Sequence, residues 1–150
     1  MRVLVTGGAG FIGHNLVKAL ISNQHQVNIL DITPSEDSRV KALIGMGASY
    51  YQGDIRDSSA ITRAGQDCTH IVHLAAQTSV PASVENPTLN DEINIIGTRN
   101  IIDFINSHDI KKIVSASSAA VYGNCDQIPL AEESAGECLS PYAESKFQNE

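Results

Sequence analysis

A tyrosine and a lysine near the end of the chain have the spacing needed for proton transfer. Tyr142 and Lys146 occupy positions i and i+4, so a helix would place the phenol and the ammonium on one face. A free phenol titrates at about pH 10 and is a poor base at neutral pH, but a fixed ammonium beside it favours the phenolate. The alternative is a solvent-exposed helical pair, because this spacing is common by chance.

Ser118 is a third candidate, because it follows an apolar run over residues 110–115 that predicts a strand. In open α/β sheets, ligands bind outside the carboxyl ends of the strands. A hydroxyl at that edge could hydrogen-bond the reacting oxygen of a substrate while Tyr142 takes its proton. We therefore predict that Ser118, Tyr142 and Lys146 are catalytic, and that Ser118 and Tyr142 also contact the substrate.

The segment Val3–Gly13 predicts a dinucleotide-binding turn. A short apolar run breaks into glycines, and a helical apolar pattern follows at once. Gly7, Gly10 and Gly13 are spaced G-x-x-G-x-x-G, and the chain also satisfies G-x-G-x-x-G from Gly8. Glycines permit the tight turn, let backbone N–H groups approach a phosphate, and let the helix lie close to the strand. The helix start then favours a pyrophosphate, the alternative being an ordinary turn.

Two acids follow predicted strands. Asp31 ends the run 27–31, at about the distance from the glycines where a ribose contact is expected. Its carboxylate would accept hydrogen bonds from the adenosine ribose and repel a 2′-phosphate, which favours NAD over NADP. Asp54 closes the next strand and is a candidate partner for the adenine amino group. The alternatives are a solvated strand-end acid for Asp31 and a turn residue for Asp54.

These residues require strands that alternate with helices. Apolar patterns predict strands near residues 3–6, 27–31, 48–52, 69–74 and 110–115. Helices are predicted over 12–21, within 33–47, over 58–64, over 89–105 and from 140 onward, with loops over 75–87 and 124–139. This alternation implies right-handed crossovers and an α/β fold with a doubly wound parallel sheet, the Rossmann architecture. We expect residues 1–150 to be one NAD-binding domain, truncated after the fifth strand and the start of the following helix, without its substrate-binding part.

Composition limits the classes of partner. The 150 residues carry a formal charge of −7, which disfavours nucleic acid and anionic membranes. No apolar run approaches the ~20 residues of a membrane span, and Met1 leads directly into a predicted core strand without a signal peptide. The cysteines, Cys68, Cys125 and Cys138, lack disulfide or zinc spacing. The histidines lack metal spacing, and His73 is expected to be packed and hydrogen-bonded. The sequence predicts a cytoplasmic protein without a metal.

These motifs resemble those of the extended short-chain dehydrogenase/reductases, specifically the NAD-dependent sugar-nucleotide epimerase/dehydratase group (UDP-glucose 4-epimerase-like). The resemblance covers the whole chain but only about the first half of a typical member. The matching segments are Thr6–Gly13, Asp31, Gly53–Ile55, His73–Gln77, Asn94–Thr98, Ser117–Gly123 and Tyr142–Lys146.

The resemblance implies roles for further residues. Lys146 would also bind the nicotinamide ribose, and Asn94 would support that site, the alternative being an amide on a helix surface. Ser79 would lie near the substrate sugar. A homodimer would form through the helices that begin near Leu89 and Pro141. The implied cofactor-binding residues are Gly7, Gly10, Phe11, Ile12, Gly13, Asp31, Asp54, Ile55, Leu74, Ala75, Ala76, Asn94, Tyr142 and Lys146.

Two alanines narrow the expected reaction. Dehydratases and decarboxylases of this group usually carry an acid just after the catalytic hydroxyl, where this chain has Ala119 and Ala120. The resemblance therefore favours an NAD-dependent isomerase that epimerises a UDP-sugar at C4 through a transient 4-keto sugar. The substrate would be UDP-glucose/UDP-galactose or a UDP-N-acetylhexosamine. The alternatives are a dehydratase, decarboxylase or reductase of the same family, or a catalytically inert NAD-binding fragment.

Overall fold

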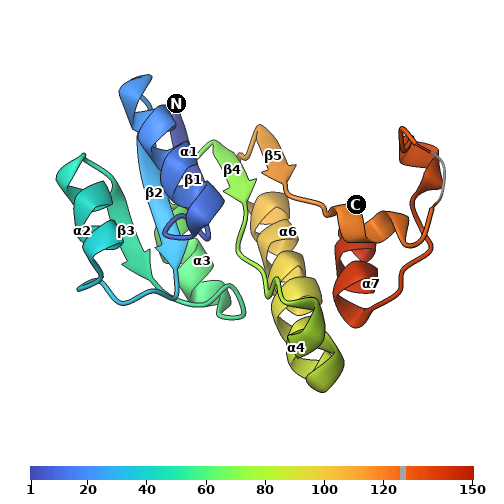
Figure 1. The fold of residues 1–150 in the computed structure, drawn as a ribbon. Coiled ribbons are helices and arrows are strands. Elements are labelled where there is room, and N and C mark those ends of the chain that lie inside the picture. The colour runs from blue at the N-terminus through green and yellow to red at the C-terminus, as the bar shows by residue number, and fades with distance from the viewer. Residues whose placement is uncertain (126–127) are drawn as a thin grey trace. The chain divides into compact units, whose positions relative to one another are not determined.

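The computed structural model describes residues 1–125 and 128–150, and the chain forms two compact units. The first unit contains residues 1–75 and 99–115, and the second contains residues 76–98 and 116–150. Figure 1 shows the elements of both units. Part of the predicted loop over 124–139 lies outside the described residues.

The first unit is built on a five-stranded sheet with the order β3-β2-β1-β4-β5. All neighbouring strands are parallel, and β1 lies at the centre, with Val3 opposite Val27 of β2 and His70 of β4. This order confirms the predicted doubly wound Rossmann sheet. The strands are β1 (Arg2–Thr6), β2 (Gln26–Asp31), β3 (Ser49–Gln52), β4 (His70–His73) and β5 (Lys112–Ser115).

Helices cover both faces of this sheet. The helices of the first unit are α1 (Phe11–Ser22), α2 (Ser38–Gly45), α3 (Ser58–Gly65) and the larger part of α6 (Gly97–Ser107). On one face, Val5 of β1 packs in a cluster with Val17 of α1 and Leu43 of α2. On the other, Asn28 of β2 donates a 2.7 Å hydrogen bond to the carbonyl of Ala64 in α3. Because successive strand residues point to opposite faces, β1 and β2 are buried on both sides.

The second unit is helical. After α4 (Val80–Glu85) come α5 (Pro87–Asp91), the π-helical turn η1 (Glu92–Ile96) and the start of α6. The 3₁₀ turns η2 (Ala119–Tyr122) and η3 (Glu132–Ser134) precede α7 (Pro141–Gln148). Helix α7 packs against α4, α5, η1 and η2, so it organises this unit.

Two stretches differ from the predictions. The predicted loop over 75–87 contains α4, because Ser79 caps the helix by accepting a 3.3 Å hydrogen bond from the N–H of Ala82, and Pro81 fits the first turn. The predicted helix over 89–105 begins earlier, at Pro87, and contains the π-helical turn. Apolar spacing is too coarse to show such a local widening.

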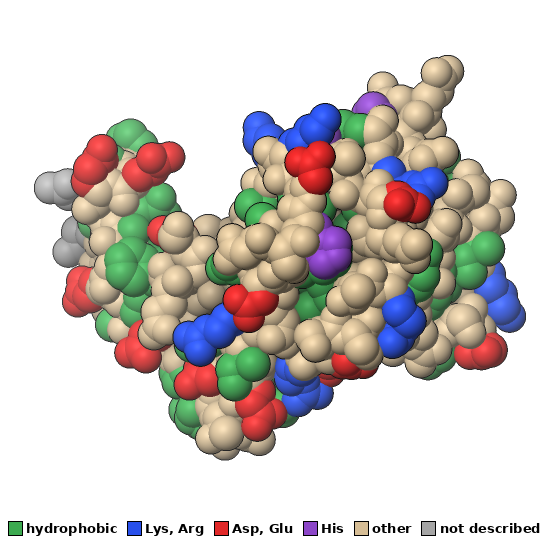
Figure 2. All heavy atoms as spheres, turned by 180° about the vertical axis from the view of Figure 1, so that it is seen from behind, with side chains coloured by type: hydrophobic (Ala, Val, Ile, Leu, Met, Phe, Trp, Pro, Cys, Tyr) green, Lys and Arg blue, Asp and Glu red, His purple; other side chains and the backbone are tan. Residues whose placement is uncertain are grey.

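The surface of the described residues carries mixed charge. On the face shown in Figure 2, basic side chains lie among acidic ones, often beside them. Across residues 1–125 and 128–150, no helix is long and apolar enough to cross a membrane. In the same described part of the chain, no group of three or more His, Cys, Asp or Glu residues could hold a metal ion. Cys68 is buried, and desolvation raises the pKa of its thiol to about 11.

Candidate active site

The glycine turn joins β1 to α1 in the first unit. Gly7 has a φ of +70°, in the left-handed region that favours glycine, and a Cβ there would lie 2.7 Å from the backbone nitrogen of Ala75. A Cβ at Gly13 would overlap the carbonyl oxygen of Gly7 and lie 2.7 Å from the Cα of Gly8. The close approach that Gly13 permits is therefore between α1 and the turn itself. Side chains at these two positions would clash with backbone atoms of the turn and of the segment after β4.

The start of α1 leaves backbone donors available. Gly10 is the N-cap and makes no side-chain hydrogen bond, and the first turn carries no acidic residue. The first two helical residues, Phe11 and Ile12, are 88% and 63% exposed. Uncapped N–H groups at the positive end of a helix suit a phosphate. The residues present therefore fit the pyrophosphate of a dinucleotide.

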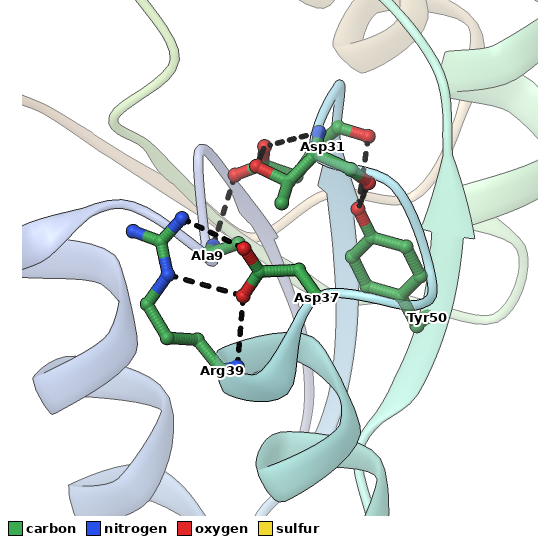
Figure 3. Close-up of polar contacts among 6 residues, drawn as sticks. Ala9, Asp31, Asp37, Arg39 and Tyr50 are labelled. Carbon is green, nitrogen blue, oxygen red and sulfur yellow. Dashed lines mark hydrogen bonds and ion pairs between the residues drawn. The ribbon is translucent and has the colours of Figure 1, made fainter.

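Asp31 lies at the carboxyl end of β2 and contacts this turn (Figure 3). Its Oδ2 accepts a 2.9 Å hydrogen bond from the N–H of Ala9. Its Oδ1 accepts hydrogen bonds from the N–H of Thr33 at 3.0 Å and from the Thr33 hydroxyl at 2.8 Å. The residue is buried, so the alternative of a solvated strand-end acid is wrong. A carboxylate offers about four acceptor positions, which leaves room for a ligand hydroxyl.

Two side chains that the sequence did not single out support the loop after β2. The Tyr50 hydroxyl donates to the carbonyl oxygens of Asp31 and Thr33 (Figure 3). Burial, with the charges of Asp31 and Asp37, raises the pKa of Tyr50 to about 12, so it remains a donor at neutral pH. Arg39 pairs with Asp37 through two 3.1 Å contacts at the start of α2. A tyrosine in a strand and a charged pair at a helix start carry no sequence signal for a site.

Asp54 and Ile55 lie between β3 and α3. The Asp54 carboxylate accepts a 2.8 Å hydrogen bond from the backbone N–H of Arg56 and pairs with the Arg56 guanidinium at 2.7 Å. The hydrogen bond from the Arg56 side chain is the main reason that the pKa of Asp54 is lowered. The Ile55 side chain is buried. Asp54 therefore has the local bonding of a turn acid, and its contact with adenine stays a prediction.

Thr6 and His73 fix the segment that follows β4. The Thr6 Oγ1 lies 2.7 Å from the Nδ1 of His73, which is 3% exposed. The same Oγ1 accepts hydrogen bonds from the N–H groups of Leu74 and Ala75, both at 3.2 Å. This confirms that His73 is packed and hydrogen-bonded. It also holds Leu74 and Ala75 close to the glycine turn, and their contact with a cofactor stays a prediction.

In the second unit, Tyr142 and Lys146 lie on α7. The helix begins where predicted, since the Ser140 Oγ accepts a 3.1 Å hydrogen bond from the N–H of Ala143 and Pro141 takes the first position. Lys146 is 6% exposed, and burial lowers the pKa of its ammonium. The alternative of a solvent-exposed pair is therefore wrong for Lys146.

Ser118 lies in the same unit, at the start of η2. Its Oγ accepts a 3.2 Å hydrogen bond from the N–H of Ala120, which leaves the hydroxyl hydrogen for a ligand. The turn η2 packs against α7. The structure thus brings together the turn that Ser118 caps and the helix that carries Tyr142 and Lys146. Ser79, the predicted sugar contact, is exposed and caps α4.

Asn94 connects the two helical segments of this unit. It is 1% exposed, so the alternative of a helix-surface amide is wrong. Its Nδ2 donates to the Ser145 Oγ at 3.1 Å and to the Gln77 carbonyl at 3.0 Å, and its Oδ1 accepts from the Gln77 N–H at 2.8 Å. Sequence reasoning missed the buried polar residues Ser83, Asn90 and Ser145. The signal for Asn90 was its place one turn before Asn94 within an apolar helical pattern.

The sheet order and the glycine turn place the first unit in the class of dinucleotide-binding α/β folds. Residues 3–150 match the model of the NAD dependent epimerase/dehydratase family, and the chain belongs to that family.

Similar proteins carry epimerase names. A protein of Methanocaldococcus jannaschii is 42% identical over 150 residues, with 99% of this chain and 48% of the relative covered. The UDP-glucose 4-epimerase of Halalkalibacterium halodurans is 37% identical over 149 residues, with coverages of 98% and 43%. The chain thus spans about half the length of the curated relatives that it matches.

Solved structures agree with this grouping. The UDP-glucose 4-epimerase of Thermus thermophilus in complex with NAD matches with a TM-score of 0.88 and 37% identity, over 99% of this chain and 48% of that chain. The UDP-N-acetylglucosamine 4-epimerase of Methanobrevibacter ruminantium, in complex with UDP-N-acetylmuramic acid, matches with a TM-score of 0.90 and 33% identity, over 99% and 48%.

Proposed function

We propose that this protein is an NAD-dependent epimerase that inverts C4 of a UDP-sugar. The observation that carries the proposal is the packing of α7, with Tyr142 and the buried Lys146, against η2, the turn that Ser118 caps. The similar proteins named above support the reaction, since they are UDP-glucose and UDP-N-acetylglucosamine 4-epimerases. The sugar is either a UDP-hexose or a UDP-N-acetylhexosamine.

NAD is the proposed cofactor, and the first unit offers residues for its pyrophosphate and adenosine ribose. The N–H groups at the start of α1 would bind the pyrophosphate, with Gly7, Gly10 and Gly13 keeping the backbone accessible. Asp31 would accept hydrogen bonds from the adenosine ribose, and its charge disfavours the 2′-phosphate of NADP. Bound NAD supplies a reversible hydride acceptor. The further proposed contacts are those of Asp54, Ile55, Leu74, Ala75, Ala76, Asn94 and Lys146.

The chain's own residues would move and hold the proton. The Tyr142 phenol oxygen takes the proton of the sugar 4-hydroxyl as C4 becomes a ketone, and it returns the proton when C4 is reduced on the opposite face. The Lys146 ammonium stabilises the phenolate. Ser118 donates a hydrogen bond to the 4-oxygen throughout. Ala119 and Ala120 offer no acid or base, which favours epimerisation over dehydration or decarboxylation.

An assay of the complete gene product with UDP-glucose and with UDP-N-acetylglucosamine tests this proposal. The expected result is a mixture of C4 epimers from at least one substrate, resolved by chromatography or NMR. Formation of a 4-keto-6-deoxy sugar or of a decarboxylated sugar would contradict it. Turnover by the complete gene product, with NAD binding but no turnover by the 150-residue chain, would identify this chain as an inert NAD-binding fragment.

We also propose a homodimer. The helical segment over residues 80–96, which contains α4, α5 and η1, exposes apolar side chains. Among them are Val84 at 61%, Leu89 at 38% and Ile96 at 47%. Large exposed apolar side chains that gather on one segment are typical of contact surfaces. Light scattering coupled to gel filtration measures the mass of the complete gene product in solution. A monomer at micromolar concentration would contradict the proposal.

A further inference from the structure

The hydroxyl of Ser83 contacts the backbone of Tyr142 inside the second unit. Ser83 lies on α4 and is fully buried, and its Oγ donates a 2.7 Å hydrogen bond to the carbonyl of Val80. The same oxygen accepts a 3.1 Å hydrogen bond from the N–H of Tyr142. The hydroxyl donor is therefore satisfied within α4, and a lone pair is directed to α7.

This contact completes the hydrogen bonding of the first turn of α7. The first N–H groups of a helix have no partner within the helix. Pro141 has no N–H, Ala143 donates to the Ser140 Oγ at 3.1 Å, and Glu144 donates to the Ser140 carbonyl at 2.9 Å. The N–H of Tyr142 is the remaining donor, and Ser83 supplies its acceptor from another helix.

Both peptide units that flank Tyr142 are held at each polar atom. In the unit before it, Asn90 donates to the Pro141 carbonyl at 3.1 Å while Ser83 accepts from the Tyr142 N–H. In the unit after it, the Ser145 Oγ donates to the Tyr142 carbonyl at 2.8 Å, and the Ala143 N–H donates to the Ser140 Oγ at 3.1 Å. Ser83, Asn90 and Ser145 are each at most 1% exposed. The two peptide planes that flank a residue fix the direction of its Cα–Cβ bond. These hydrogen bonds therefore fix the direction in which the Tyr142 side chain leaves α7.

We propose that Ser83 is a positioning residue for Tyr142. It acts through the backbone of α7 and touches no reacting atom. The inference rests on the proposed function, in which Tyr142 is the base, because a misplacement of about 1 Å at a reacting group can lower the rate about 100-fold. If Ser83 served only α4, its hydrogen bond to the Val80 carbonyl would satisfy the hydroxyl, and no acceptor contact with α7 would be needed.

Amide hydrogen exchange tests the contact without any assay of activity. The chain has four tyrosines, so ¹⁵N-tyrosine labelling gives four amide signals, and Tyr142→Phe identifies the signal of Tyr142 by its loss. Slow exchange of the Tyr142 amide is expected in the unmodified chain, and exchange about tenfold faster in Ser83→Ala. The amides of Tyr50 and Tyr51 should not change. Ser107→Ala, a serine replacement on α6, is the matched control and should leave all four signals unchanged.

Kinetics of the complete gene product test the positioning role. Ser83→Ala is expected to lower kcat about tenfold or more while KM and the Kd for NAD change less than about twofold. A general loosening of the fold would alter all three. An inactive wild type would overturn the proposed function, and amide exchange would still decide the contact.

Three outcomes overturn the inference. The first is fast exchange of the Tyr142 amide in the unmodified chain, which decides the matter even if Ser83→Ala fails to fold. The second is equal exchange of that amide in Ser83→Ala. The third is an unchanged kcat for Ser83→Ala in an active enzyme.

Discussion

Lys146 combines a charge with burial, and that combination opposes folding. Desolvation disfavours the ammonium, which is why the pKa of Lys146 is lowered. An apolar side chain of similar length would fill the same space without that penalty. The proposed function gives a reason for the lysine, because it assigns the ammonium to stabilising a phenolate at Tyr142, one helical turn away. Stability and activity should therefore respond in opposite directions to its replacement.

Lys146→Met tests this at the level of stability. Because the folded pKa is lower than the unfolded one, the unfolded state binds the proton more tightly, and the penalty is fully present below the folded pKa. Lys146→Met is expected to raise Tm by ~2–4 °C at pH 7. The difference should shrink as the pH rises toward the ordinary lysine value of about 10.4. Thermal melts at several pH values measure it, and a gain that is independent of pH would assign the effect to packing alone.

Tyr142→Phe removes the proposed base and keeps the ring. General bases contribute about 10²–10⁴ to rate, so kcat of the complete gene product should fall by at least about 100-fold. The Kd for NAD should change little, since most of the proposed cofactor contacts lie on other residues, the glycine turn and Asp31 among them. Tyr51→Phe, on β3, is the matched control and should leave both quantities unchanged. Turnover that survives in Tyr142→Phe would show that another group takes the proton.

At the scale of elements, the sequence predicted what local signals control. Ser140 and Pro141 predicted the start of α7, and short runs between predicted helices indicated the position of each strand of the sheet. The π-helical turn was missed because apolar spacing does not resolve a local widening, and α4 was missed because it has only six residues and lies in a Ser- and Pro-containing stretch. The contacts around Tyr142 could not be predicted either. Ser83 and Tyr142 are 59 residues apart in the chain, and only the folded unit brings them together.

Gly13 shows how an element depends on one missing side chain. Gly13→Ala would place a Cβ against the carbonyl oxygen of Gly7 and 2.7 Å from the Cα of Gly8, so the turn or the helix must shift. The expected result is loss of at least ~2 kcal/mol of stability, together with at least tenfold weaker NAD binding. Denaturant unfolding and calorimetric titration measure the two effects.

Gly45→Ala is the matched control for that prediction. Gly45 ends α2, and a Cβ there would meet nothing within 4 Å. The substitution reduces the freedom of the unfolded chain, so stability should stay the same or rise by about 0.4–1 kcal/mol. Equal destabilisation by both substitutions would show that the close approach at Gly13 is unimportant.

At the scale of the whole molecule, the proposed contacts are divided between the two units. The glycine turn, Asp31 and Leu74 belong to the first unit, and Asn94 and the residues of α7 belong to the second. The chain also spans only about half the length of the curated relatives that it matches. Ligands that use different parts of the protein should therefore stabilise this chain to different extents.

Thermal melting of the 150-residue chain with single ligands tests this division. NAD at about 100 times its Kd should stabilise the chain by about 2.7 kcal/mol, a rise in Tm of about 5–10 °C. NADP at the same concentration should give a smaller rise, because the Asp31 carboxylate would face its 2′-phosphate. UDP should give no rise if its contacts lie in the part of the relatives that this chain does not match. A shift with UDP equal to that with NAD would place the substrate nucleotide site within these residues. Equal shifts with NAD and NADP would remove Asp31 from the ribose site, since a fixed carboxylate there must distinguish a hydroxyl from a phosphate.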